Sequence, residues 1–463
     1  MVEAAIAVSL GRIGILTALV AALGIYLYAY ERPNLEREAA EANLLDVETD
    51  AVTALTLTFP DRTIALERRD DRWTLTAPVE DTADATQVRS LLGSLMAAKI
   101  AKTLDDLPDD LSDFGLATPE PVIRLTAGDT PAIEIRVGRN TSIGNKTYVQ
   151  MGDDDAVHLT QSNLRVALDK KATDFRDKQL LTFEDDAVSR VVIRGAEREP
   201  LTLERVDANA WTIEPGGLPA DLTEVRSYLS SLRSTRAVGF PDDLPEDPAA
   251  SGFDAPHLTV AIFTDDPSAA HATLQIGNER QEGEQTQVYA KRAGRDTIVT
   301  LGQWSLRSLD QGVNHFRDKT VLGFDLEHVG KATFDRTAGD GLVLERNDAG
   351  GWALVGSPRV LEQAAVTRLL TDLRDLKGSD VVAESDVDLA AFGLDTPELR
   401  IVLSDRGGEP IGTVLLTRRD DKYYTSAVGA EVVYETRDYM YTRLDKTPDD
   451  LAPSMPPAAS DDG

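Results

Sequence analysis

The sequence contains no cysteine among its 463 residues, which excludes disulfide bonds, thiolate metal sites and cysteine nucleophiles. The compartment stays open, because a chain without cysteine tolerates oxidising and reducing surroundings alike. Basic residues are also scarce: 48 lysines and arginines stand against 79 aspartates and glutamates, for a formal net charge of -31. A surface this acidic repels phosphate backbones, so we expect no nucleic-acid partner.

The residues that usually carry catalysis or hold metals are sparse as well. The five histidines show no i, i+4 pairing, so no zinc site is expected. Aspartate runs, such as those at 105–110 and 153–155, lack the spaced ligands and glycine of a calcium loop and are interpreted as solvated turns. Residues 138–147 resemble a phosphate-binding loop with the wrong spacing, so a hairpin turn is predicted there. No Gly-x-Ser-x-Gly motif occurs. We predict a protein that is not an enzyme, with no catalytic residue, metal or cofactor.

One long apolar run stands near the amino terminus. Residues Ile13 to Tyr30 form 18 positions without a charge, which as a helix would reach about 27 Å. We predict a single transmembrane anchor over residues 1–30, with the membrane contact at 13–30, followed by a helical stalk over 31–46. Two alternatives are a buried helix and a signal peptide cleaved after Gly24. The flanking charges barely decide the orientation.

The rest of the chain is ordinary in composition, with 42% hydrophobic and 27% charged residues, and it repeats itself. Three segments align: LERRDDRWTL from Leu66, LERVDANAWTI from Leu203 and LERNDAGGWAL from Leu344. By subtraction of residue numbers, Trp73, Trp211 and Trp352 are 138 and 141 residues apart. The spacing predicts three copies of one unit.

The same elements follow in each copy. A helix with one apolar stripe is predicted after each tryptophan, with capping boxes at Asp84 and Asp221 but not at Glu362. A Gly-x-x-x-Pro turn then introduces a strand, at Gly115 to Pro119, Gly252 to Pro256 and Gly393 to Pro397. The predicted fold class is therefore α+β, with three tandem copies of a mainly antiparallel sheet plus helix.

The first two copies end in the same string, Phe-Arg-Asp-Lys, here called the closing string. Its residues are Phe175, Arg176, Asp177 and Lys178 in the first copy, and Phe316, Arg317, Asp318 and Lys319 in the second. In the third copy, residues 442–446 are interpreted as a degenerate echo, and Thr417 replaces the glycine found at Gly138 and Gly277. Decay in the last copy suggests that the closing string lies at a junction between copies. The predicted repeats are 47–186, 187–327 and 328–450, before a disordered tail at 451–463.

The anchor, the tryptophan hairpin, the Gly-x-x-x-Pro turn and the closing string together resemble the bacterial family called domain of unknown function 4340 (DUF4340), over roughly residues 46 to 450. The resemblance implies a protein of the inner membrane with its bulk on the periplasmic side, associated with ABC-type transport components related to gliding-motility exporters. It carries over no catalytic residue.

Three functions remain open from the sequence. The leading hypothesis is a non-enzymatic scaffold or accessory protein of a transport or export assembly, and the others are a glycan- or peptide-binding module and a hydrolase with an unrecognised site. The three tryptophans are interpreted as core residues rather than sugar platforms. Arg176 and Arg317 are expected to pair with acidic neighbours rather than to bind an anionic ligand.

Overall fold

The computed structural model describes residues 26, 43–104, 107–128, 130–152, 154–241, 248–264, 266 and 268–453. Apart from Tyr26, the predicted anchor lies outside these residues, as do the stalk up to residue 42 and the tail from residue 454. Within the described ranges, no helix combines the length and the apolar character needed to cross a membrane.

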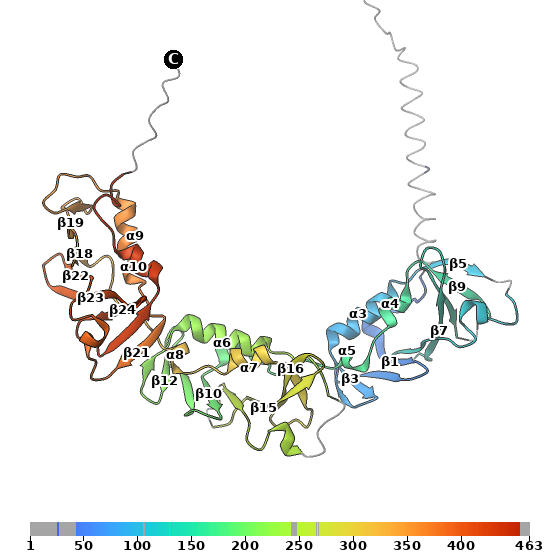
Figure 1. The fold of residues 1–463 in the computed structure, drawn as a ribbon. Helices are drawn as coiled ribbons and strands as arrows, with labels where there is room; N and C mark the ends of the chain where they lie inside the picture. The colour runs from blue at the N-terminus through green and yellow to red at the C-terminus, as the bar shows by residue number, and fades with distance from the viewer. Residues whose placement is uncertain are drawn as a thin grey trace, which may run out of the picture. The chain divides into compact units, whose positions relative to one another are not determined.

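Three antiparallel sheets follow one another along the chain (Figure 1), which confirms the predicted α+β class with three copies. The first sheet has the order β4-β3-β2-β1-β6-β7-β8-β9-β5. Its strands are β1 (Val52–Thr58), β2 (Thr63–Arg69), β3 (Arg72–Ala77), β4 (Asp81–Thr82), β5 (Ile100–Leu104), β6 (Val122–Ala127), β7 (Ile133–Asn140), β8 (Thr147–Met151) and β9 (Val157–Thr160).

The second sheet repeats this arrangement as β13-β12-β11-β10-β14-β15-β16-β17. Its strands are β10 (Arg190–Gly195), β11 (Leu201–Arg205), β12 (Trp211–Glu214), β13 (Leu218–Pro219), β14 (Leu258–Phe263), β15 (Ala272–Glu282), β16 (Gln285–Arg292) and β17 (Val299–Gly302).

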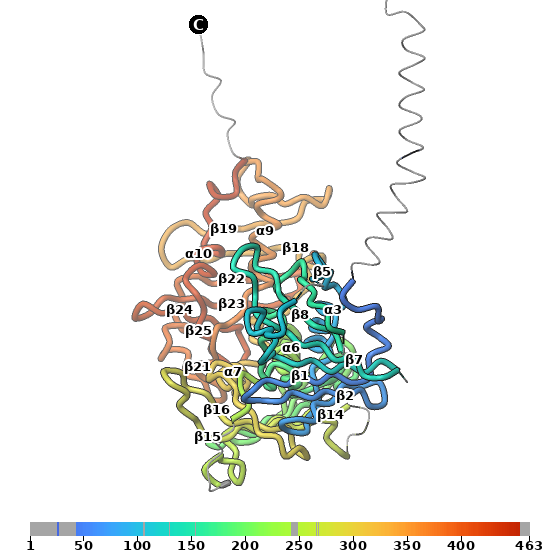
Figure 2. Tube along the Cα trace, turned by 90° about the vertical axis from the view of Figure 1, so that its right-hand side faces the viewer, coloured from blue at the N-terminus to red at the C-terminus, as the bar shows by residue number. Residues whose placement is uncertain are grey.

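The third sheet has the order β20-β19-β18-β22-β23-β24-β25-β21, and Figure 2 shows β22 to β25 in succession. Its strands are β18 (Val329–Arg336), β19 (Leu342–Arg346), β20 (Trp352–Leu354), β21 (Asp380–Glu384), β22 (Leu399–Asp405), β23 (Pro410–Arg419), β24 (Lys422–Ala427) and β25 (Val432–Thr436). In all three sheets the strand after the Gly-x-x-x-Pro turn pairs with the first strand of the copy.

Each copy has one long helix whose apolar stripe is buried, as the spacing predicts. The helices are α3 (Ala85–Met96), α6 (Leu222–Ser234) and α9 (Gln363–Arg374). The buried stripes are Val88, Leu91, Leu92 and Leu95, then Val225, Tyr228, Leu229 and Leu232, then Val366, Leu369, Leu370 and Leu373.

Short helices complete each copy and lie beside the long helix on one face of the sheet (Figure 1). They are α4 (Leu164–Leu168) and α5 (Ala172–Phe175), α7 (Gln303–Leu309) and α8 (Val313–Phe316), and α10 (Asp438–Leu444). Short 3-10 turns are η2 (Thr49–Ala51), η3 (Ser112–Phe114), η4 (Asp185–Ala187), η5 (Pro248–Ser251) and η6 (Leu389–Phe392).

The packed copies extend slightly beyond the predicted boundaries. Leu44 and Leu45 are 5% and 4% exposed and belong to the core of the first sheet, so the first copy begins before residue 47. Leu451 is 2% exposed in the core of the third sheet, so the third copy continues past residue 450.

The chain forms two compact units, and each is described here by itself. The first ends at Gln179 and also includes Arg236–Phe240, which follows α6. The second comprises Leu180–Thr235 and the chain from Pro241 onward, so the second and third copies belong to one unit.

Candidate functional site

The phenylalanines of the closing strings are core residues. Phe175 and Phe316 are both fully buried, and the Phe316 ring lies edge-on against Tyr228 at 5.0 Å. The Phe175 carbonyl accepts the N–H of Asp84 at 2.7 Å, and the Phe316 carbonyl accepts that of Asp221 at the same distance. In a capping box, the N–H of the capping residue donates to the side chain of the third helical residue. Here that N–H donates to a main-chain carbonyl of the closing string instead.

The carboxylates of Asp84 and Asp221 do cap their helices. Asp84 accepts the N–H groups of Thr86 and Gln87, and Asp221 accepts that of Thr223 at 2.9 Å. At the third copy, Glu362 makes no such side-chain bond, as the departure from the pattern predicts.

The arginines of the closing strings pair with acidic groups. The Arg176 Nε lies 2.6 Å from the Asp81 carboxylate, and its guanidinium stacks 3.8 Å from the centroid of the Phe240 ring. Arg317 forms an ion pair with Glu384 of the third copy. Both guanidinium groups are therefore engaged within the protein.

The remaining closing-string residues join one copy to a segment of the next. The Asp177 carboxylate accepts the N–H of Gln179, and the Asp318 carboxylate accepts that of Thr320. The carbonyls of Lys178 and Lys319 then accept main-chain N–H groups at 2.8 and 2.9 Å, from Ala237 and Gly378 respectively.

The first copy has no copy before it, and the described residues just before its sheet pair with the segment after its long helix instead. Asn43 forms a bridge with Lys99, as Gln179 does with Arg236 and Thr320 with Lys377. Every copy therefore receives a strand-like segment immediately after its long helix. The closing string lies at the junctions, and the contacts there are largely main-chain bonds.

The interpretation of residues 442–446 as an echo of the closing string is wrong. Leu444 instead corresponds to Leu168 at the end of a short helix. The Leu444 carbonyl accepts the N–H of Lys446, as the Leu168 carbonyl accepts that of Lys170. The counterpart of Phe175 is Leu451, whose carbonyl accepts the N–H of Glu362 at 2.8 Å. The sequence match fails because leucine replaces phenylalanine and no arginine follows.

The tryptophans pack against the sheets. Trp211 and Trp352 are 3% and 6% exposed, and Trp73 packs against the first core. The arginine of each LER motif belongs to this hairpin and donates to carbonyl oxygens at or just before the start of the first strand. The bonds run from Arg68 to Asp50, from Arg205 to Asp185 and Val188, and from Arg346 to Leu326 and Val329.

The Gly-x-x-x-Pro glycines all adopt positive φ angles, of 71°, 78° and 73° at Gly115, Gly252 and Gly393, where glycine is favoured. A second glycine lies on the adjacent strand, and a Cβ at Gly277 would be 1.9 Å from the Ser251 carbonyl. The strand pairing shifts there, whereas at the equivalent Thr417 the register is regular. Each of the three prolines, Pro119, Pro256 and Pro397, lies shortly before its strand.

Sequence inspection missed an ion pair that recurs in every copy. The Asp after the short helix, at 169, 310 or 445, lies 3.6, 2.6 and 2.6 Å from Arg62, Arg198 and Arg336 respectively. The first two arginines lie in the turn after the first strand, but Arg336 is the last residue of β18. The shifted position hides the pattern from sequence alignment.

Sequence features that imitate known sites are turns. Residues 138–147 form the end of the β7–β8 hairpin, where Thr141 donates its N–H to the Lys146 carbonyl at 2.7 Å. Residues 105, 106 and 153 lie outside the described ranges, and Asp110 caps the turn at Ser112. Across the residues that the structure describes, no three histidine or acidic side chains gather as a metal site would require.

The first copy has a cleft whose arginine side chains are hydrogen-bonded to the protein's own main chain. It has a volume of about 550 Å³ and lies beside Phe59, Arg62 and Arg165. Arg165 donates to the carbonyls of Glu120 and Gly138, and Arg62 to that of Lys170, so both arginines hold the main chain.

A larger cleft, here called the junction cleft, lies between the second and third copies and has a volume of about 670 Å³. Its wall from the second copy comprises Asp221, Glu224, Asn314, His315 and Lys319. Its wall from the third copy comprises Asp375, Lys377, Gly378, Ser379, Asp380, Thr436, Arg437, Tyr439 and Met440.

An ion pair and a hydrogen bond join the two walls of this cleft. The Lys377 ammonium donates to the Asp221 carboxylate at 2.5 Å, and Asn314 donates to Asp380 at 3.1 Å. Burial alone would raise the pKa of Asp221, but the hydrogen bonds from Lys377 and from the Thr223 N–H, together with the charge of Lys377, outweigh it and the pKa is lowered. Burial likewise opposes the charge of Lys377, yet Asp221 raises its pKa.

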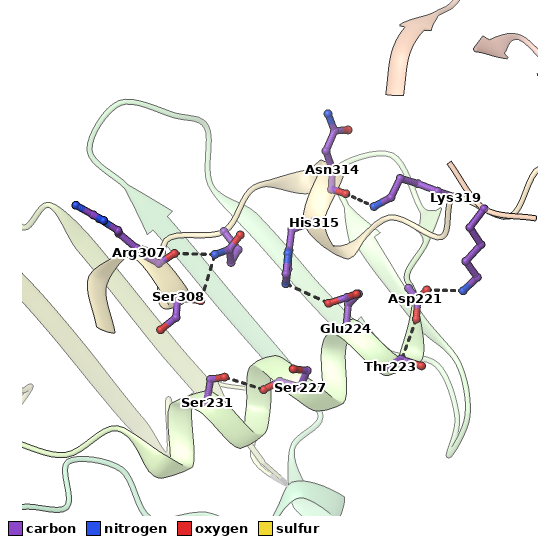
Figure 3. Close-up of polar contacts among 12 residues, drawn as sticks. Asp221, Thr223, Glu224, Ser227, Ser231, Arg307, Ser308, Asn314, His315 and Lys319 are labelled. Atoms are coloured by element: carbon purple, nitrogen blue, oxygen red, sulfur yellow. Dashed lines mark hydrogen bonds and ion pairs between the residues drawn. The ribbon is translucent and has the colours of Figure 1, made fainter. Parts of the chain in front are cut away.

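His315 and Glu224 both belong to the second-copy wall and face each other (Figure 3). The His315 Nε2 lies 3.5 Å from the Glu224 carboxylate. Burial lowers the pKa of the imidazole, Glu224 opposes that shift, and the Lys319 ammonium adds to it. In the described part of the chain, no serine hydroxyl is hydrogen-bonded to His315.

His315 is specific to this copy. The equivalent residues are Asp174 and Asp450, and each accepts the N–H of the residue three positions earlier at 2.8 Å. Histidine offers no carboxylate for that bond, and its ring points toward Glu224 instead (Figure 3). Glu224 is also unique, since Gln87 and Ala365 stand at its place two residues after the first helical residue.

Comparison with known proteins gives one family. The family model described as "Domain of unknown function (DUF4340)" matches residues 73–256, 211–364 and 357–454. The first two matches begin at Trp73 and Trp211, so they start at equivalent points of two copies. The family resemblance drawn from the motifs is thereby confirmed. No curated protein matches the chain.

Proposed function

We propose that this chain, which belongs to the DUF4340 family, is a non-enzymatic scaffold or accessory protein of an ABC-type transport or export assembly. In this proposal residues 13–30 anchor it in the inner membrane by one span, and the three copies stand on the periplasmic side. The transport assignment rests on the family resemblance and the apolar run, and the scaffold role rests on the repeats.

The observation that carries the scaffold role is how the shared side chains are used. The closing-string phenylalanines are buried, their arginines are paired, and their main chain bonds to the segment after the next long helix. Residues that recur in the copies therefore hold the repeat together. Surfaces that differ between copies are left for contact with partners.

The hydrolase alternative finds less support in the junction cleft. Four carboxylates line it, at Asp221, Glu224, Asp375 and Asp380. A paired acid and base would need carboxyl groups free to exchange protons with a substrate, but Asp221 is bound to Lys377 and Asp375 to Arg374.

The test is affinity capture of the full-length chain from native membranes, with a tag at its carboxyl end. We expect transporter subunits to be enriched with the full chain but not with a matched chain that starts at residue 43. Protease digestion of spheroplasts gives the sidedness in the same preparation. Recovery of the full chain in the membrane fraction without any transport subunit would argue against the scaffold proposal.

A further inference from the structure

We propose that the junction cleft is a binding site for a peptide, and that it recognises one carboxylate group of that peptide. The inference goes beyond the scaffold proposal and does not depend on the transport partner, because it concerns the chemistry of the cleft alone. It rests on unused cationic groups, on the pairing of the acidic ones and on the differences between copies.

Two cations in the cleft keep donors free for a ligand. The Lys319 ammonium makes a single hydrogen bond, 2.5 Å from the Asn314 carbonyl (Figure 3), although an ammonium has three donors. Among the described residues, the Arg437 guanidinium has no hydrogen-bond or ion-pair partner. The two belong to opposite walls of the cleft, so both copies offer a cation to a bound anion.

The acidic residues of the cleft are largely neutralised by their neighbours. Asp221 accepts from Lys377, Asp380 accepts from Asn314, and Asp375 accepts from Arg374 at 2.7 Å. Glu224 faces the His315 ring. The net charge of -31 nevertheless repels polyanions at long range. These features favour a ligand with one carboxylate over a strongly acidic polymer.

The rest of the lining suits a peptide better than a sugar. Sugar sites present a free aromatic face, but the exposed Tyr439 ring has the Arg443 guanidinium 5.3 Å from its centroid. The hydroxyls of Ser379 and Thr436 donate to the Glu435 and Lys377 carbonyls, and their oxygens can still accept main-chain N–H groups along the third-copy wall. The volume of about 670 Å³ lies within the usual range for small ligands.

The difference between copies points the same way. An aspartate stands at the position of His315 in the other two copies, and a carboxylate facing this cleft would repel the bound one. Histidine at residue 315 leaves this position without a negative charge, and the carboxylate particular to this copy, Glu224, faces the His315 ring.

The test is fluorescence anisotropy with the full-length chain and three labelled peptides of alternating glycine and alanine. One ends in a free carboxylate, one is amidated, and one is amidated but carries an internal glutamate. We expect the two carboxylate-bearing peptides, or one of them, to bind more tightly than the neutral amidated peptide. Preference between those two tells whether the chain end or a side chain supplies the carboxylate.

Variants place the binding in the cleft. Arg437→Gln should weaken the carboxylate-bearing peptide about tenfold or more, since hydrogen bonds between charged groups are lost. His315→Asp should weaken it as well. Arg124→Gln is the control, because this arginine is exposed and lies on β6 of the first copy. Equal binding of all three peptides, no binding at all, or an unchanged affinity in Arg437→Gln would overturn the proposal.

Discussion

The pair Asp221 and Lys377 provides a quantitative test of how the second and third copies are held together. Asp221 has two roles, since its carboxylate caps α6 through the Thr223 N–H and also accepts from Lys377. Removal of a capping side chain costs about 1 kcal/mol. The ion pair contributes roughly 0.5–1 kcal/mol, because Asp221 is 14% exposed but Lys377 is 48% exposed.

Substitutions separate the two roles. Asp221→Asn keeps the cap, since asparagine caps as well as aspartate, and should cost about 0.5–1 kcal/mol. Asp221→Ala loses both contacts and should cost about 1.5–2 kcal/mol. Lys377→Met should cost as much as Asp221→Asn, and almost nothing in the Asp221→Asn background.

Asp84 is the matched control. It caps α3 in the same way through Thr86 and Gln87, and its carboxylate makes no ion pair among the described contacts. Asp84→Ala should cost about 1 kcal/mol, and Asp84→Asn should be close to neutral. The comparison therefore isolates the contribution of Lys377 from that of the cap.

The pH dependence follows from the two shifts. The pKa of Asp221 is lowered, so its contribution is present above about pH 4 and is lost as the pH falls through the folded value. The pKa of Lys377 is raised, so its contribution is present below about pH 10 and is lost as the pH rises through the folded value. The pair should therefore stabilise throughout the neutral range.

Hydrogen exchange of α6 amides, measured along a urea series, gives the local free energy of opening for each variant. A coupling energy between Asp221→Asn and Lys377→Met that is zero within error would refute the reasoning. So would equal costs for Asp221→Asn and Asp84→Asn.

Further predictions concern other positions of the repeat. Phe316→Ala should cost about 3–5 kcal/mol by urea unfolding, and Phe316→Leu clearly less, because the third copy has leucine there. Glu362→Asp should stabilise the third copy by about 0.5–1 kcal/mol by supplying the missing cap, and an unchanged melting temperature would count against this. Gly277→Ala should destabilise the second copy, since its Cβ would meet the Ser251 carbonyl. Burial lowers the pKa of His315, so the imidazole binds a proton more readily in the unfolded chain than in the folded one. The free energy of unfolding should therefore decrease as the pH falls below about 6.5, and His315→Gln should lack the contribution of this group to the decrease.

The sequence predicted the repeating elements because each has a local signal. Tryptophan spacing located the hairpins, helical periodicity located the buried stripes, and glycine with proline located the turns before β6, β14 and β22. The end of the third copy was misplaced, because Leu444-Asp445-Lys446 repeats Leu168-Asp169-Lys170 rather than the closing string.

The candidate site could not be predicted in the same way. The junction cleft is lined by four segments, near residues 221, 315, 378 and 437, that have no common motif. His315 and Glu224 lie 91 residues apart by subtraction of their numbers, and only the packing of α8 on α6 brings them together. Neither residue recurs at the equivalent position of the other copies, so a search for repeated motifs passes over them. In a repeat protein, however, residues that differ between copies are the ones that mark a candidate site.

Main-chain joining explains how such variation is tolerated. The segment after each long helix is bridged by Asn43, Gln179 or Thr320, three different residues in one position. Backbone N–H and C=O groups form these bonds whatever the side chain, so the junction does not constrain the residues around it. The buried phenylalanine and the capping aspartate carry the specificity of the joint, since the Phe316 side chain is fully buried and the Asp221 carboxylate is paired with Lys377. Positions such as the exposed 314 and the half-buried 315 are then free to differ between copies, and each junction can acquire its own binding chemistry without loss of the repeat.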